Sequence, residues 1–125
     1  MQCSDVMRGE VFSIGANDTV QSAALRMRAT GVGILLVCDG GGHVLGTVSD
    51  RDVALRLAAE DRIASRSVVD DIMTPEVVAC RPTDDVARVE EMMIRHRRSR
   101  VIVMDDDGKV EGVVSLYDVA GEVGA

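Results

Sequence analysis

The sequence has almost no aromatic residues: Phe12 and Tyr117 are the only two among 125, and tryptophan is absent. A core must therefore be built from Val, Ile, Leu, Met and Ala, which suit thin and closely packed layers. Hydrophobic residues make up 46% of the chain, enough to exclude disorder of the whole protein. The length allows one compact domain or two very small ones.

Cysteine is also scarce, and long apolar runs are missing. Cys3, Cys38 and Cys80 are an odd number without C-x-x-C spacing. Cys38 and Cys80 lie in apolar, strand-like runs, where a free cysteine usually acts as a small hydrophobic residue. The longest strongly apolar run, Ile34–Cys38, is far too short to cross a bilayer, and no signal-peptide pattern opens the sequence. We expect a reduced, cytoplasmic protein without membrane association.

Basic residues are outnumbered, and the net charge is −7 with a pI of about 4.7. This balance opposes the phosphate contacts on which nucleic-acid binding depends. The run from Arg95 to Arg100 is a local exception. Its cations either end a helix, where the helix dipole favours them, or hold a phosphate group.

The sequence contains an internal repeat. A shift of 66 residues aligns 5–54 with 71–120 without a gap, and 17 of the 50 positions are identical. A chance match would give about four or five identities for so valine-rich a composition. The two segments are therefore copies of one structural unit.

The apolar pattern of each copy predicts the order β-α-β-β-α. A short strand comes first, and a helix begins at an acidic helix-start residue, Asp18 or Asp84. Two strands joined by a hairpin turn follow, and the second strand leads into another helix. The expected strands are Val11–Ile14, Ile34–Cys38 and Val44–Ser49 in the first copy, and Val77–Cys80, Val101–Met104 and Val110–Ser115 in the second.

Neither copy alone can bury a comfortable core. We therefore expect repeat 1 (5–60) and repeat 2 (71–122), joined by the polar connector 61–70, to pack into one α/β (α+β) body. The copies should be related by approximate two-fold symmetry, which would create two equivalent clefts.

A glycine, a serine and an aspartate recur where each copy runs from a strand into a helix. "GTVSDRDVA" (residues 46–54) returns as "GVVSLYDVA" (residues 112–120). A serine followed three residues later by an acidic residue is close to a capping box, which is a purely structural feature. The same carboxylate could instead accept hydrogen bonds from a ribose diol, beside a helix end that favours phosphate. The glycine would then let a ligand approach the backbone.

These repeats resemble a tandem pair of cystathionine β-synthase (CBS) domains, a Bateman module, of the stand-alone bacterial type. The resemblance covers about residues 5–121. The motifs that carry it are "DVM", "DIMTPEVV", "LLVCDGGGHVLGTVSDRDVA" and "VIVMDDDGKVEGVVSLYDVA".

The resemblance implies a regulatory module that binds an adenosine-containing ligand (AMP, ADP, ATP, S-adenosylmethionine or similar) in the clefts between repeats. It implies no catalysis, no required cofactor, a homodimer formed through the helices, and an unidentified regulated protein as a possible further partner. Carried over by position, the ligand-binding residues would be Asp52 and Asp118 for the ribose, Ser49 and Ser115 for ribose or phosphate, Arg51 and Arg100 for phosphate, and Val11, Phe12, Val77 and Val78 beside the base.

Three alternatives remain. An enzyme would have only His43 and His96, without a nucleophile elbow, a Walker loop or a carboxylate pair. A metal site would have to use cysteines and histidines that lack finger-like spacing. A protein-interaction scaffold with empty clefts would use apolar helix faces as a partner surface. The helical residues considered for such a surface, not all of which can face inward, are Met27, Leu55, Leu57, Met92 and Met93.

Overall fold

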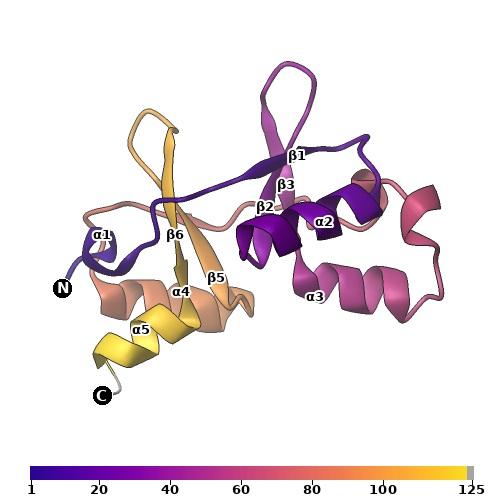
Figure 1. The fold of residues 1–125 in the computed structure, drawn as a ribbon. Helices are drawn as coiled ribbons and strands as arrows, with labels where there is room; N and C mark the ends of the chain where they lie inside the picture. Colours follow the sequence, from indigo (N-terminus) through magenta and orange to yellow (C-terminus); the bar gives the residue numbers. More distant parts are fainter. Residues whose placement is uncertain (124–125) are drawn as a thin grey trace. The chain divides into compact units, whose positions relative to one another are not determined.

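The computed structural model describes residues 1–123, with side chains up to residue 120. Its contacts divide the chain into two compact units. The first unit is Phe12–Val77, and the second unit combines Met1–Val11 with the chain from Val78 onward. Each unit contains one β-α-β-β-α repeat, so the predicted mixed fold with two repeats is confirmed (Figure 1).

The first unit is built on a three-stranded sheet with the order β1-β2-β3. Strand β1 runs parallel to β2, and β2 runs antiparallel to β3, with Ile34 opposite Ser49. The starts of β1 and β2 therefore share one end of the sheet with the end of β3. The elements are β1 (Ser13–Gly15), α2 (Val20–Thr30), β2 (Ile34–Cys38), β3 (Val44–Ser49), α3 (Asp50–Asp52), the π-helical continuation η1 (Val53–Ala58), and the 3-10 turns η2 (Ala64–Arg66) and η3 (Val69–Asp71).

The second unit repeats this arrangement with a sheet of order β4-β5-β6. Arg100 on β5 lies opposite Ser115 on β6, as Ile34 lies opposite Ser49 in the first unit. The elements are α1 (Cys3–Val6), β4 (Ala79–Cys80), α4 (Val86–His96), β5 (Arg100–Met104), β6 (Val110–Ser115) and α5 (Leu116–Val123).

The first long helix of each repeat begins one residue later than the sequence predicts. Thr19 caps α2 by accepting a hydrogen bond from the Ser22 amide, and Asp85 caps α4 by accepting one from the Ala87 amide. The expected helix-start residue Asp18 instead accepts a hydrogen bond of 2.8 Å from the Gly15 amide. It closes the turn that leads from the strand to the helix, a common use of a short acidic side chain.

Each unit has its own core, and both cores are built mainly from aliphatic side chains, as the shortage of aromatic residues predicts. The buried core of the first unit is Val20, Ala23, Met27, Leu35, Val37, Val48, Leu57, Val69 and Ile72. That of the second unit is Cys3, Val78, Cys80, Val86, Val89, Met93, Val101, Val103, Val114 and Val119. Val69 belongs to the first core although it lies in the polar segment 61–70.

The segment that opens each repeat in the sequence packs in the unit of the other repeat. Cys3 donates a backbone hydrogen bond of 2.8 Å to Asp84, and Val69 donates the equivalent bond of 2.9 Å to Asp18. Farther along, Arg8 pairs with the edge of β6. Residues 67–74, which lead into the second repeat, thus cover the first repeat. Residues 1–8, which lead into the first repeat, cover the second repeat.

Candidate functional site

Ser49 and Asp52 form a complete capping box at the start of α3. The Asp52 amide donates to the Ser49 hydroxyl at 3.2 Å, and the Ser49 amide donates to Oδ2 of Asp52 at 2.9 Å. Ser49 has extended backbone angles, so its side chain can reach the free amides of the first helical turn. The structural interpretation of this motif is therefore correct: it starts a helix.

The second unit repeats the box at the start of α5. The Asp118 amide donates to the Ser115 hydroxyl at 3.1 Å, and the Ser115 amide donates to Oδ2 of Asp118 at 3.0 Å. In both boxes Oδ2 serves the cap. A function beyond capping would therefore depend on the other carboxylate oxygen, Oδ1.

The two Oδ1 atoms have different partners. Oδ1 of Asp52 accepts a hydrogen bond of 3.2 Å from the buried hydroxyl of Thr74, and the Nε of Arg56 lies 4.0 Å away. Oδ1 of Asp118 lies 3.8 Å from the Nε of Arg8. Arg8 and Thr74 occupy equivalent positions 66 residues apart in the two repeats. The same position therefore brings the Thr74 hydroxyl to Asp52 and the Arg8 guanidinium to Asp118.

Arg8 is mostly exposed, with 74% of its side chain accessible, whereas the Asp118 side chain is 13% exposed. Arg56, by contrast, donates a hydrogen bond of 2.9 Å to the Met73 carbonyl and so holds the segment that carries Thr74. The first unit uses its carboxylate and nearby cation to join parts of its own fold. The second unit keeps a solvent-accessible cation next to its carboxylate.

Gly46 and Gly112 were expected to let a ligand approach the backbone. This expectation is wrong for the space that a Cβ atom would occupy, because the protein itself fills that space. A Cβ on Gly46 would meet the carbonyl oxygen of Thr74, and one on Gly112 would lie 2.6 Å from that of Arg8. The opening segments of the repeats fill this space, since each pairs with a strand edge there. The glycines therefore allow the backbone of the chain itself to approach.

The residues expected beside the base lie near the same sheet ends. The carbonyl of Phe12 accepts a hydrogen bond from the Leu36 amide. The Cζ atom of Arg26 lies over the Phe12 ring, 5.6 Å from the ring centroid. Val78 is buried in the core of the second unit. Val11 and Val77 are half-buried.

The structure divides the ten predicted site residues equally between the units. Arg51 is exposed on α3, and Arg100 is half-buried opposite Ser115. The first unit holds Phe12, Ser49, Arg51, Asp52 and Val77, and the second holds Val11, Val78, Arg100, Ser115 and Asp118.

The sequence reasoning missed Arg8, Arg56 and Thr74. The alignment that pairs residues 5–54 with 71–120 already places Arg8 opposite Thr74, so their difference was visible as a departure from the repeat. The contacts of Arg8 with Asp118 and of Thr74 with Asp52 were not visible, because Arg8 and Thr74 each belong to a segment that packs with the other repeat.

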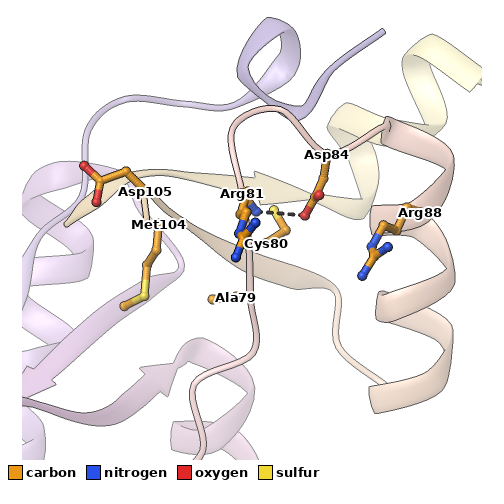
Figure 2. Close-up of a pocket in the computed structure, with 7 residues that line it drawn as sticks. All are labelled: Ala79, Cys80, Arg81, Asp84, Arg88, Met104 and Asp105. Atoms are coloured by element: carbon orange, nitrogen blue, oxygen red, sulfur yellow. Dashed lines mark hydrogen bonds between the residues drawn. The ribbon is translucent and has the colours of Figure 1, made fainter. Parts of the chain in front are cut away.

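Each unit also has a cavity at the opposite end of its sheet, near the hairpin. In the second unit a cavity of about 490 Å³ is lined by Ala79, Cys80, Arg81, Asp84, Arg88, Met104 and Asp105 (Figure 2). The equivalent cavity of the first unit has about 450 Å³ and is lined in part by Gly15, Asp18, Cys38 and Asp39. Both lie away from the capping boxes, because the carboxyl ends of β4 and β5 point away from Ser115.

Two kinds of site are missing from the part of the chain that the structure describes. There, no group of three or more His, Cys, Asp or Glu side chains is placed to hold a metal ion. Among the helices of residues 1–123, none has both the length and the hydropathy that a membrane span needs.

Two units with the same strand order, each closed by a Ser-x-x-Asp capping box, define a tandem β-α-β-β-α module. The family model of the CBS domain matches residues 3–59 and 69–125. The chain belongs to the CBS domain family, as the sequence motifs predicted.

Individual proteins resemble nearly the whole chain. The CBS domain-containing protein YhcV of Bacillus subtilis is 32% identical over 116 residues, which are 93% of this chain and 81% of YhcV. The structure of a candidate signal-transduction protein with CBS domains from Burkholderia ambifaria has a TM-score of 0.90 at 27% identity, covering 98% of this chain and 93% of that one. The CBS domain pair of protein MJ0100, solved with 5′-methylthioadenosine and S-adenosyl-L-methionine, has a TM-score of 0.85 at 23% identity, with 99% and 96% covered.

Proposed function

We propose that this protein is a regulatory module that binds an adenosine-containing ligand and catalyses no reaction itself. The observation that carries the proposal is the pairing of Asp118, at the start of α5, with the exposed cation of Arg8. The MJ0100 pair holds such ligands, but its 23% identity supports only the shared fold. The proposal therefore depends on the residues of this chain.

The second unit offers the two kinds of group that a nucleotide requires. Oδ1 of Asp118 can accept hydrogen bonds from ribose hydroxyls while Oδ2 continues to cap the helix. Arg8 can turn from Asp118 toward a phosphate or a carboxylate of the ligand, because its side chain is mostly exposed and lies 3.8 Å from the carboxylate, where an ion pair contributes little stability. Arg100, opposite Ser115 across the sheet, would add a second positive charge.

The first unit is the weaker candidate. A ribose there would compete with Thr74 for Oδ1 of Asp52, and loss of that buried hydrogen bond would cost free energy. We propose that the second unit binds first and more tightly. Val11 and the backbone near Val78 would lie beside the base.

The test is a thermal-shift panel with AMP, ADP, ATP and S-adenosylmethionine. A ligand at about 100 times its Kd adds about 2.7 kcal/mol to the free energy of unfolding, which for this size raises Tm by about 5–15 °C. Asp118→Asn should abolish the shift, and Arg8→Met should reduce it for the charged ligands. Asp52→Asn is the matched control and should keep most of it.

Two results would contradict the site assignment. If Asp118→Asn keeps the full shift with a normal unfolding curve, the ribose contact is not at Asp118. If no compound of the panel shifts Tm of the unaltered protein, the adenosine ligand itself is wrong.

A second candidate function is a dimeric interaction scaffold, and exposed apolar side chains favour it. On the second unit, Ile94 is 70% exposed and Tyr117 is 82% exposed; on the first, Leu55 is 51% exposed. Among the helical residues considered from the sequence, Met27, Leu57 and Met93 are instead buried in the cores. We propose that the exposed set mediates a homodimer, which is compatible with ligand binding and would be the remaining function if no ligand binds.

A further inference from the structure

Two cysteines that are distant in the sequence meet in the second unit. The Sγ atoms of Cys3 on α1 and Cys80 on β4 lie 3.1 Å apart, and both side chains are buried and unbridged. Cys38, the third cysteine, is half-buried in the first unit. The contact therefore joins the opening segment of the chain to the sheet of the second unit.

Packing alone does not require sulfur at these positions. In the first unit, the positions equivalent to Cys3 and Cys80 are occupied by Val69 and Ile14. Val69 makes the same backbone hydrogen bond as Cys3 and belongs to the first core, against which Ile14 packs. Aliphatic side chains thus pack at the equivalent positions of the first unit, so the fold does not need thiols there. The paired thiols of the second unit are therefore available for a chemical role.

We propose that Cys3 and Cys80 form a reversible disulfide that fixes the opening segment of the chain to the second unit. The oxidant is a hydroperoxide. A thiolate attacks its distal oxygen, which forms a sulfenic acid and releases an alcohol, or water from hydrogen peroxide. The second thiolate displaces the sulfenic oxygen as water and closes the S–S bond. Two thiols are oxidised, one hydroperoxide is reduced, and a dithiol reductant reverses the bond by exchange.

The contact between the sulfur atoms favours this chemistry. The hydrogen bond between the two thiols lowers the pKa of Cys3, because a thiolate at Cys3 is stabilised when the Cys80 thiol donates to it. The same bond, together with burial, raises the pKa of Cys80. These directions favour Cys3 as the attacking thiolate, with Cys80 keeping its proton until the second step.

A route for the oxidant exists on the Cys80 side. Cys80 lines the cavity of about 490 Å³, with Arg81 and Asp84 beside it (Figure 2). Cys3 lies on a helix of only four residues, and backbone hydrogen bonds to Pro82 and Asp84 hold this segment. Local opening of this end of the chain, without unfolding of the whole unit, would expose both sulfur atoms.

The disulfide would have a consequence for Arg8, five residues after Cys3. It would hold the strand pairing between Arg8 and Val113 and keep the guanidinium near Asp118. If the second unit binds a nucleotide, as proposed above, oxidation would then alter its affinity. This consequence rests on the proposed function, whereas the disulfide itself does not.

The experiment uses the full chain in native buffer, treated with a small excess of hydrogen peroxide and then unfolded for thiol counting with a chromogenic disulfide reagent. The count should fall from three to one, and peptide mapping should find Cys3 joined to Cys80. The closed loop restricts the unfolded chain, so Tm should rise by about 10 °C, and dithiothreitol should reverse the rise.

The matched control is the double variant C3V/C80I, which copies the aliphatic residues of the first unit. It should fold, keep its single thiol and show no Tm rise with peroxide. Cys38→Ala should still lose two thiols. The proposal is overturned if peroxide leaves all three thiols free, or yields sulfinic acids or an intermolecular bond at Cys38 instead. Because these readouts need no ligand, failure of nucleotide binding would leave this result unaffected.

Discussion

The hydroxyl of Thr74 donates a buried hydrogen bond of 3.2 Å to Oδ1 of Asp52. This bond joins the start of α3 to the segment that follows η3, and the second unit has Arg8 in place of Thr74. Because the two units otherwise share their capping boxes, this difference is the basis for our proposal that Asp52 is structural and that Asp118 is available to a ligand.

Replacing Thr74 by valine should lower the free energy of unfolding by about 1–3 kcal/mol, because Oδ1 of Asp52 would be buried without its hydroxyl donor. Urea titration measures the change. Thr30→Val is the control, since the Thr30 hydroxyl donates to a backbone carbonyl at the exposed end of α2. Equal losses in both variants would show that the bond to Asp52 adds nothing.

Asp52→Ala should destabilise the protein more than Asp118→Ala. Each substitution removes the carboxylate that accepts a hydrogen bond from the amide of the capping serine, which costs about 0.5–1.5 kcal/mol. Asp52→Ala also leaves the buried Thr74 hydroxyl without an acceptor, whereas Asp118→Ala releases a mostly exposed arginine. Guanidinium unfolding of both variants should give a difference of about 1 kcal/mol or more. The reverse order would contradict the assignment of Asp118 as the available carboxylate.

Gly46→Ala should be strongly destabilising, since the added methyl group would collide with the carbonyl of Thr74. Backbone displacement of this kind typically costs about 1–3 kcal/mol, and here it would also break the strand pairing between Thr47 and Thr74. Gly40→Ala serves as the control because a Cβ there would meet no atom within 4 Å. Thermal unfolding of the two variants should differ clearly; similar Tm values would argue against the close approach at Gly46.

The hairpin of the first unit should respond to acid through Asp39. Backbone hydrogen bonds from His43 and Gly41 hold the pKa of Asp39 below its ordinary value. Stability from this carboxylate is present above the unfolded-state pKa and is lost as the pH falls through the lower folded-state pKa. Asp39→Ala should therefore destabilise the protein at pH 7, and the difference should shrink toward pH 2–3. Carboxyl NMR titration of Asp39 measures the shift directly, and an ordinary value would refute the prediction.

Tyr117→Ser should weaken the proposed homodimer, because this side chain is 82% exposed on α5 and would lose most of its area in an interface. Sedimentation velocity at micromolar concentration should show a shift toward monomer. Ile63→Ser is the control, since Ile63 is exposed in the loop before η2. A strict monomer before substitution would contradict the dimer.

The sequence alone determined the repeat, the order of the elements and the capping boxes. These features depend on residues close together in the chain: Val44–Ser49 and Val110–Ser115 have the bounds that their apolar patterns predict. Asp18 was misassigned as a helix start by one residue, because the turn before α2 and the cap of α2 both favour short polar side chains.

Only the tertiary structure decided which opening segment covers which repeat. That choice brings Arg8 to Asp118, Thr74 to Asp52 and Cys3 to Cys80, although the last two residues are 77 positions apart. Local patterns carry no record of such contacts, because each of the equivalent segments 1–8 and 67–74 could by its local pattern cover either sheet. The free energy of burying Val69 and Cys3, each in a core formed by the other repeat, depends on the folded chain as a whole.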